Sequence, residues 1–575
     1  MEIDGKRVHL VEVVVKRSGH VYRNFYLRHS WREGGKVRTE TLATLSEAEA
    51  LQFRAVFGQP SLGLAEPVSV AESYPYGDAA AALAMLRQCG LVEAISERRG
   101  QDRKLALGLI LAQLLSAGSK ASHADFLSPS KTLSFLGLEL GLGEVHENDL
   151  YEALDWLGRR QTRIEKHLAA KHLKDGGMVL YDLSSSYFEG THCPLAERAY
   201  SRDHRSDLPQ INYGLLCAEN GCPVAVEVFP GNVNDVKSMP AQIEKLRDRF
   251  GLKRIVVVGD RGMLTSAKVR QELTEAGYGW ITALRRDSIE SLRKAKLIQP
   301  SLFDERNLAE ISDPKHPGER LVVCFNPFSK ERNEKTRASL IEASQAALDQ
   351  VIKRTRQQRN RLEGKGPIGM AAGAALAKFK VQKYFRVHID EMSLSYELRQ
   401  DVLDRDAALD GIYVVRTTVD KEHMSAEQVR DSYVSLSRVE RAFRCLKSVD
   451  LQVRPIRHHL AGRVKAHVFL CMLAYYVEWH LRLAWEGLIK EPRNGKDSKP
   501  ARRPRRRGET PVPPHSFRGI LQVLRSVTKN RMRIGNRLAE CCTTSERTPL
   551  QAEALRLAGW CRQSCAPGDP AETPI

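Results

Sequence analysis

Three carboxylates in the sequence have the setting that phosphodiester chemistry requires. Asp182 and Asp260 each follow a short apolar run, 179–181 and 255–259. Glu440 lies in a basic segment with helical spacing. Two divalent ions about 3.5–4 Å apart can activate an attacking oxygen and stabilise the leaving one. We therefore expect Asp182, Asp260 and Glu440 to be the catalytic residues and the metal ligands.

The expected metal is magnesium, because it prefers oxygen ligands and keeps several of its waters. We predict two Mg²⁺ ions, with Mn²⁺ able to replace them. Asp182 would bridge the ions, while Asp260 and Glu440 would each hold one. A lone aspartate after an apolar run is more often a turn residue or a cap. The prediction therefore depends on the order of the surrounding elements.

Strands and helices around the two aspartates follow a recognisable order. The apolar patterns predict β-β-β-α-β-α-β over these ranges: 178–182, 211–218, 224–229, 236–250, 254–259, 266–276 and 279–284. This is the order that an RNase H-like core requires. Asp182 would end its first strand and Asp260 its fourth.

Glu440 is too far from Asp260 for the interval to be a loop. That interval has a long basic helix near 334–362, a Gly/Ala-rich break at 364–375, and strand-like runs at 379–389, 392–398 and 412–418. We interpret it as an inserted subdomain.

The fold class is therefore α/β, or multidomain α+β. An RNase H-like catalytic core is interrupted by an insertion and preceded by a small β meander and a helical region. A chain of 575 residues is too long for one core. We expect six segments: a basic β-rich region at 1–70, a helical, DNA-binding domain at 71–175, the first core part at 176–288, the insertion at 289–425, the last core part at 426–490, and a basic linker with one or two helices at 491–575.

Within these segments, 148–173 reads as one helix with Asn148 as its N-cap, and 466–489 reads as a buried helix that does not span a membrane. The meander's Lys and Arg side chains could enter a DNA groove or form a solvated face.

The net charge of +19 suits a polyanionic partner, because each neutralised phosphate releases counterions. We expect double-stranded DNA as that partner. The 11 cysteines show no C-x-x-C spacing, which argues against a zinc ribbon and fits reduced thiols. The N-terminus has no apolar signal region. We expect a cytoplasmic, nucleoid-associated bacterial protein with no membrane partner.

Several motifs resemble the DDE transposases of bacterial insertion sequences, in the branch with a Tyr-x-x-Arg-x-x-x-Glu-x-x-x-x-x-x-Lys signature. Segments 181–190 and 200–210 resemble the region of the first catalytic aspartate and the hairpin after it. Segment 231–235 has the Gly-Asn-x-x-Asp pattern, and 258–263 resembles the second aspartate with its glycine. The resemblance covers roughly residues 175–480.

The third motif fits with one departure. Tyr433, Glu440 and Lys447 have the signature spacing, but Leu436 stands at the arginine position. Positions seven apart share one helical face, so we expect all three on one helix. The resemblance implies DNA contacts by Tyr433 and Lys447. Arg438, Arg441 or Arg444 would supply the missing cation. We expect these three arginines and Arg261, the residue after Asp260, to contact DNA.

The resemblance implies a transposase that cleaves the terminal inverted repeats of its element and joins the 3′ hydroxyl to target DNA. It also implies a homodimeric complex that pairs both ends, and a hairpin intermediate. Two alternatives remain: an RNase H-like nuclease without strand transfer, and an inactive DNA-binding protein derived from a transposase.

Each of the weaker site candidates has two possible roles. The polar cluster Asp203, His204, Arg205 and Asp207 could line the DNA path, which we favour slightly, or cap a turn. For His458 and His459 a structural role is favoured over a phosphate contact. For Trp280 a buried core position is favoured over stacking on a flipped base.

Overall fold

The computed structural model describes residues 2–3, 6–17, 20–33, 36–46, 49–50, 69–264, 266–299, 303, 306–448, 450–489, 515–534 and 537–560. The chain forms two compact units. The first comprises Met1–Leu173, Leu183–Asn234 and Val439–Ile575, and the second comprises Lys174–Asp182 and Asp235–Arg438. Strand β6 (Met178–Tyr187) belongs to the second unit up to Asp182 and to the first unit after it.

The second unit contains parallel strands at the centre of a mixed sheet. β6 pairs in parallel with β9 (Val256–Gly259), and β9 pairs in parallel with β10 (Gly279–Ala283). Helices α9 (Asp235–Glu244) and α10 (Ala267–Glu275) connect these strands, as predicted. β10 then pairs antiparallel with β15 (Ile412–Thr417).

In the first unit, β7 (Gln210–Ala218) lies beside β6 and pairs antiparallel with β8 (Pro223–Pro230). Every residue of β7 is buried, which accounts for its nearly continuous apolar pattern. Both units contribute to β6, and the strand order on either side of it in the sheet is β10-β9-β6-β7-β8. The predicted α/β class with an RNase H-like core is confirmed.

Two strands that the sequence analysis missed extend the sheet of the second unit. These are β11 (Leu308–Ile311) and β12 (Arg320–Phe325), and β12 pairs with β15. β15, which we expected within the insertion, therefore belongs to the main sheet. Leu284, Leu321 and Val414 lie in one hydrophobic core around these strands.

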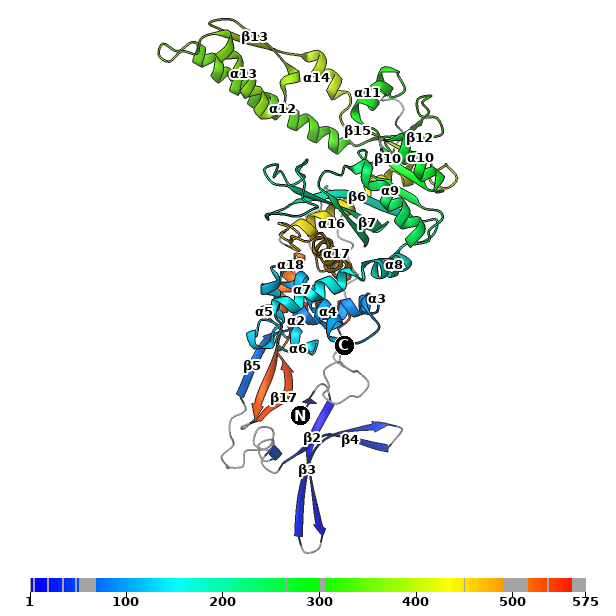
Figure 1. Cartoon of the computed structure of the whole chain (residues 1–575), viewed down its shortest axis with the longest axis vertical. Coiled ribbons are helices and arrows are strands. Elements are labelled where there is room, and N and C mark those ends of the chain that lie inside the picture. Colours follow the sequence, from blue (N-terminus) through cyan, green and yellow to red (C-terminus); the bar gives the residue numbers. More distant parts are fainter. Residues whose placement is uncertain are drawn as a thin grey trace, which may run out of the picture. The chain divides into compact units, whose positions relative to one another are not determined.

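Helices α12 (Pro327–Thr355) and α13 (Lys365–Phe379) run side by side (Figure 1). With β13 (Phe385–Ile389), β14 (Leu394–Leu398) and α14 (Gln400–Ala407), they form a subdomain with its own core, which includes Leu348, Ile368 and Leu376. The predicted break at 364–375 is wrong, because residues 365–375 are part of α13 and Gly364 is its N-cap. Its alanines favour helix, and packing on α12 offsets the cost of its glycines.

The helical region of the first unit is confirmed. Its helices are α2 (Gly77–Gln88), α3 (Leu91–Ile95), α4 (Gln101–Leu115), α5 (Lys120–Leu127), α6 (Leu136–Glu139), α7 (Glu147–Gly158) and α8 (Gln161–His172), with a 3₁₀ turn at Pro129–Lys131.

The single helix expected at 148–173 is wrong, because α7 ends at Gly158 and α8 begins at Gln161. The N-cap of α7 is His146, whose backbone N–H donates to Asp149 at 2.8 Å. Asn148 is therefore inside the helix. A Cβ at Gly158 would lie 2.9 Å from the Cβ of Ala466, so glycine permits the close approach of α17 (Ala461–Ala484). The prediction of a buried helix at 466–489 is confirmed by α17.

At the N-terminus, β2 (Lys6–Arg17), β3 (His20–Glu33) and β4 (Lys36–Leu45) form the predicted antiparallel meander, with the short β1 (Glu2–Ile3) at its edge. The C-terminal helices are α18 (Phe517–Arg525) and α19 (Pro549–Leu557). Strands β16 (Thr528–Ile534) and β17 (Arg537–Thr544) were missed, and β16 also pairs with β5 (Ser69–Pro75). The predicted basic linker at 491–514 lies outside the described residues.

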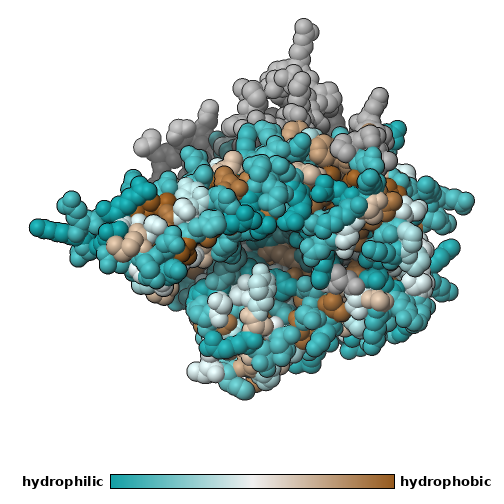
Figure 2. All heavy atoms as spheres, turned by 90° about the horizontal axis from the view of Figure 1, so that it is seen from above, coloured by the Kyte–Doolittle hydropathy of each residue, from teal (hydrophilic) through white to brown (hydrophobic). Residues whose placement is uncertain are grey.

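The face shown in Figure 2 is covered mostly by hydrophilic residues. Within the described part of the chain, no single helix is long and apolar enough to span a membrane. Only α4 and α5 together meet that length and composition, across a bend of 106°.

Candidate active site

Asp182 and Asp260 occupy equivalent positions on neighbouring parallel strands. Tyr181 on β6 is in register with Gly259, the last residue of β9. Asp182 is the next residue of β6, and Asp260 is the first residue after β9. Asp182 is half-buried and Asp260 is exposed. The second unit therefore holds these two carboxylates at one level of its sheet.

A further carboxylate of the second unit, Asp235, lies at the same turn. A Cβ built on Gly262 would lie 3.0 Å from Oδ2 of Asp235 and 3.8 Å from Oδ2 of Asp260. Asp235 begins α9 and is half-buried. We did not predict it as a site residue, although it ends the Gly-Asn-x-x-Asp pattern. That pattern was the only sequence signal for it.

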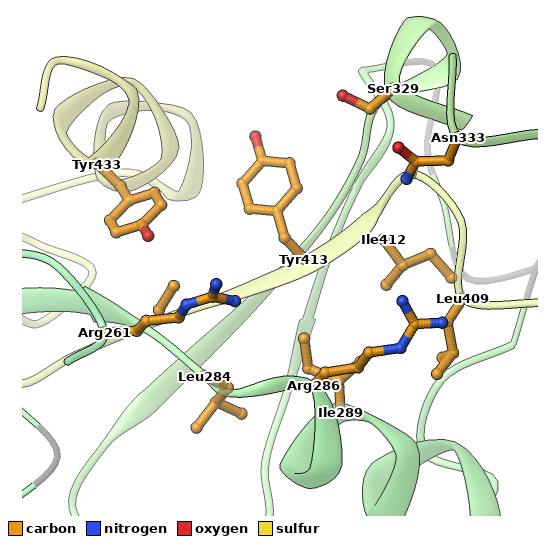
Figure 3. A pocket seen from close by; sticks show the side chains of 12 residues that line it. Arg261, Leu284, Arg286, Ile289, Ser329, Asn333, Leu409, Ile412, Tyr413 and Tyr433 are labelled. Atoms are coloured by element: carbon orange, nitrogen blue, oxygen red, sulfur yellow. The ribbon is translucent and has the colours of Figure 1, made fainter. Parts of the chain in front are cut away.

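Arg261 and Tyr433 line one pocket of the second unit, with a volume of about 280 Å³. Figure 3 shows Arg261, Tyr413 and Tyr433 around the same opening, with Arg286 on the helix below. Arg286 is also paired with Asp406 at 3.2 Å. Cationic and phenolic groups gathered in this way can bind phosphate oxygens.

Tyr433 and Glu440 do not share a helix, so that part of the sequence prediction is wrong. Tyr433 lies on α15 (Ala426–Val434), and Glu440 lies on α16 (Ser437–Lys447). The hydroxyl of Ser435 donates to the Ser432 carbonyl at 2.6 Å at this break. Serine side chains compete with backbone hydrogen bonds in this way. Leu436, at the signature arginine position, lies in the turn that follows α15 and is buried.

Helix α16 has an apolar face and a charged face. The buried residues are Val439, Ala442, Phe443, Cys445 and Leu446. The exposed charged residues are Arg438, Glu440, Arg441 and Arg444.

Packing within the first unit holds α16 against the sheet. The ring of Phe443 contacts that of Tyr213 on β7, with centroids 5.8 Å apart. The Tyr213 hydroxyl is hydrogen-bonded to that of Ser186 on β6 at 2.9 Å. The helix that exposes Glu440 therefore packs on the strand next to β6.

Lys447 has a protein partner. Its Nζ donates to Oδ1 of Asp203 at 2.9 Å, and Arg454 pairs with the same oxygen at 2.6 Å. The Asp203 side chain is only 2% exposed. Burial lowers the pKa of Lys447, and Asp203 opposes that shift. Asp203 therefore forms a buried ion pair, which neither suggested role of its cluster, lining the DNA path or capping a turn, had described. The DNA path along this cluster and the DNA contact of Lys447 stay predictions.

The other weak candidates have structural settings. Trp280 is 1% exposed, which confirms the buried reading. His458 packs against His467, with ring centroids 5.1 Å apart. Burial lowers the pKa of His458 to about 4. The exposed His459 contacts the His192 carbonyl at 3.2 Å.

The donor atoms at the edge of the sheet in the second unit suit a hard cation. Asp182, Asp235 and Asp260 offer carboxylate oxygens, which magnesium prefers over nitrogen or sulfur. Asp235 and Asp260 lie beside Gly262, which has no side chain to fill the space between their carboxylates.

Two family models match this chain. Residues 190–477, half of the sequence, match the transposase DDE domain. Residues 10–57 match the N-terminal domain of the IS1634 family transposases. The chain belongs to the DDE transposases of insertion sequences. The first match includes Asp260 and Glu440 and begins after Asp182. DNA binding and the use of divalent metal ions are general to this family. The comparison with curated proteins found no match for this transposase.

Proposed function

We propose that this transposase cleaves the ends of its insertion sequence and joins the 3′ hydroxyl to target DNA by two-metal phosphodiester chemistry. The observation that carries the proposal is that Asp182 and Asp260 directly follow Tyr181 and Gly259, which are in register on the parallel strands β6 and β9. Parallel strands of a buried sheet are rigid, and rigid ligands keep two ions at a fixed spacing.

In this proposal Asp182, Asp260 and Glu440 hold two Mg²⁺ ions, which Mn²⁺ can replace. Bound ions would supply charge stabilisation at the attacking and leaving oxygens. Asp182, Asp260 and Glu440 would supply the carboxylate ligands for those ions. The exposure of Glu440 on α16 is compatible with this role, because its carboxylate is not buried in the core of the first unit.

The proposed DNA contacts come from two groups of residues. Arg261 and Tyr433 share the pocket of Figure 3 and would hold a phosphate near Asp260. Arg438, Arg441 and Arg444 lie on the exposed face of α16, around Glu440. Lys447, which is half-buried and paired with Asp203 at the end of α16, is the further proposed DNA contact.

The DNA partners would be the terminal inverted repeats and the target, with a homodimer pairing two ends. Sequence-specific binding would come from residues 1–175, where the meander and the helical region lie. Deleting this range should abolish the footprint on element ends, while an unchanged footprint would contradict the assignment.

The test uses purified full-length protein, end-labelled DNA carrying the element end, unlabelled target DNA and Mg²⁺. Cleavage with joined products would support transposition. Cleavage alone would support the nuclease alternative, and binding alone the inactive binder.

The matched variants are Asp182→Asn, Asp260→Asn and Glu440→Gln, which keep side-chain size and remove one charge. Each should reduce cleavage by roughly 100-fold or more, because a metal ligand acts in the transition state. Glu342→Gln, at an exposed position on α12, is the control and should cleave normally. Normal cleavage by any of the three site variants would remove that residue from the site.

A further inference from the structure

The first unit holds three metal-binding side chains close together. They are His172 at the end of α8, Cys222 in the turn between β7 and β8, and His480 on α17. One ligand atom from each lies within 4.8 Å of the other two. These segments are far apart in the sequence, so no spacing motif could have indicated the group.

Hydrogen bonds leave two nitrogens suited to a metal. The Tyr476 hydroxyl donates to the Cys89 carbonyl at 3.3 Å, so its oxygen accepts from Nε2 of His172 at 2.8 Å. That bond makes Nδ1 the lone-pair nitrogen of His172, in the way that outer hydrogen bonds orient metal-bound histidines. Nε2 of His480 is buried and has no hydrogen-bond partner.

The protonation states favour metal binding by the histidines. Burial lowers the pKa of His172 and of His480 to about 4. Both imidazoles are therefore neutral near pH 7, and a neutral imidazole is the form that binds a metal. Burial raises the pKa of the Cys222 thiol, so metal binding would release its proton.

An ordinary buried histidine cluster is the alternative explanation. It accounts for His172, which has Tyr476 as its partner. It does not account for Nε2 of His480, because a buried polar atom without a partner costs about 1–3 kcal/mol. The nearby cation Lys171 is bonded to the Cys89 carbonyl at 2.6 Å. A Cys222 thiolate would offset its charge.

We propose that His172, Cys222 and His480 bind a zinc ion that ties α8 and α17 to the β7–β8 turn. Zinc takes nitrogen and sulfur ligands in a tetrahedron, where neighbouring ligand atoms lie about 3.6 Å apart. The three ligand atoms now lie within 4.8 Å of one another, so the group would contract on binding the ion. Water takes the fourth position, because His172 and His480 are only half-buried.

A second group of candidate ligands, Cys445, Asp450 and Glu478, does not support the same proposal. Glu478 accepts from Arg482 at 2.6 Å, and Asp450 accepts from Arg518 at 2.8 Å. Arginine partners already neutralise these carboxylates.

Cobalt(II) titration of the metal-free full-length protein tests the site. We expect one ion per chain bound with a sulfur-to-cobalt charge-transfer band and the strong visible bands of a tetrahedral site. Cys222→Ser should abolish the charge-transfer band and weaken binding by at least ~100-fold. Cys324→Ser, at a buried cysteine of the second unit, is the matched control and should keep the band.

Thermal unfolding with zinc gives a second readout. Zinc should raise the unfolding midpoint of the wild type but not that of His480→Asn, which also carries the test if Cys222→Ser fails to fold. Asp260→Asn should keep the band, which separates this site from the proposed active site. Cobalt binding without a thiolate band, or a band that survives Cys222→Ser, would overturn the proposal. So would equal zinc stabilisation of the wild type and His480→Asn.

Discussion

Lys447 and Asp203 form an ion pair that fixes the end of α16 within the first unit. The pair joins Nζ and Oδ1 at 2.9 Å, and the carboxylate is almost fully buried. Removing one partner of a buried pair leaves an uncompensated charge. Arg454 would remain beside Asp203 and would reduce that cost.

We predict that Lys447→Met lowers the free energy of unfolding by about 1–3 kcal/mol, measured by urea denaturation. Asp203→Asn should destabilise the protein in the same direction without touching the lysine charge. Lys465→Met, at an exposed lysine of α17, is the control and should change stability little. Weaker DNA binding by Lys447→Met at unchanged stability would show instead that Lys447 acts only on DNA.

Gly262 is the position where a small change should disturb the site without removing any of its groups. An alanine Cβ there would lie 3.0 Å from Oδ2 of Asp235, so the carboxylate or the turn must move. A displacement of about 1 Å near reacting groups can cost roughly 100-fold in rate. We expect Gly262→Ala to reduce cleavage by about 10- to 100-fold while the unfolding midpoint changes little.

Gly373→Ala is the matched control, because a Cβ at that glycine of α13 meets no atom within 4 Å. It should cleave normally and gain a little stability through helix propensity. Asp235→Asn should raise the Mg²⁺ concentration needed for half-maximal cleavage if Asp235 supports the metal site. Wild-type activity in Gly262→Ala would show that the turn tolerates the displacement.

The part of the site that sequence predicted well depends on local patterns. Asp182 and Asp260 each follow an apolar strand, and strand order alone makes those strands neighbours. The registry of Tyr181 with Gly259 then follows from the fold. The meander and α17 were predicted for the same reason, since their periodicity is contained within one segment.

The errors have physical causes that local patterns do not show. Residues 433–447 have helical spacing, but the Ser435 hydroxyl bonds the Ser432 carbonyl where α15 ends. Lys447 finds Asp203 at a separation of 244 residues, and no motif encodes such a contact. Segment 364–375 becomes helical because α12 packs against it.

Arg261 should contribute to DNA affinity through a phosphate contact. Each neutralised phosphate releases counterions, so losing one contact should reduce the slope of log affinity against log salt by about 0.9. We expect Arg261→Ala to weaken binding of specific and unrelated DNA to a similar degree. Lys268→Ala, at an exposed lysine of α10, is the control. A loss confined to the element-end sequence would indicate base recognition in place of the phosphate contact.

Buried histidines should make the first unit sensitive to acid. Burial lowers the pKa of His123 to about 3 and that of His458 to about 4, from an ordinary 6.5. Between about pH 6.5 and pH 4, the unfolded chain therefore binds protons that the folded chain does not. Stability falls as the pH falls through this window, with a slope of up to about 1.4 kcal/mol per pH unit for each histidine.

Asp78 acts in the opposite direction. Burial raises its pKa from 3.8 to about 6, so the folded chain holds a proton there that the unfolded chain lacks. This carboxyl stabilises the fold as the pH falls, but it is outweighed by His123 and His458 together with His172 and His480, whose pKa values burial also lowers. We expect urea unfolding to show a net loss of stability between about pH 6.5 and pH 4.5. His123→Gln should flatten that dependence, whereas His459→Gln, at an exposed position, should leave it unchanged. Stability that stays constant across this window would mean that the buried histidines titrate normally.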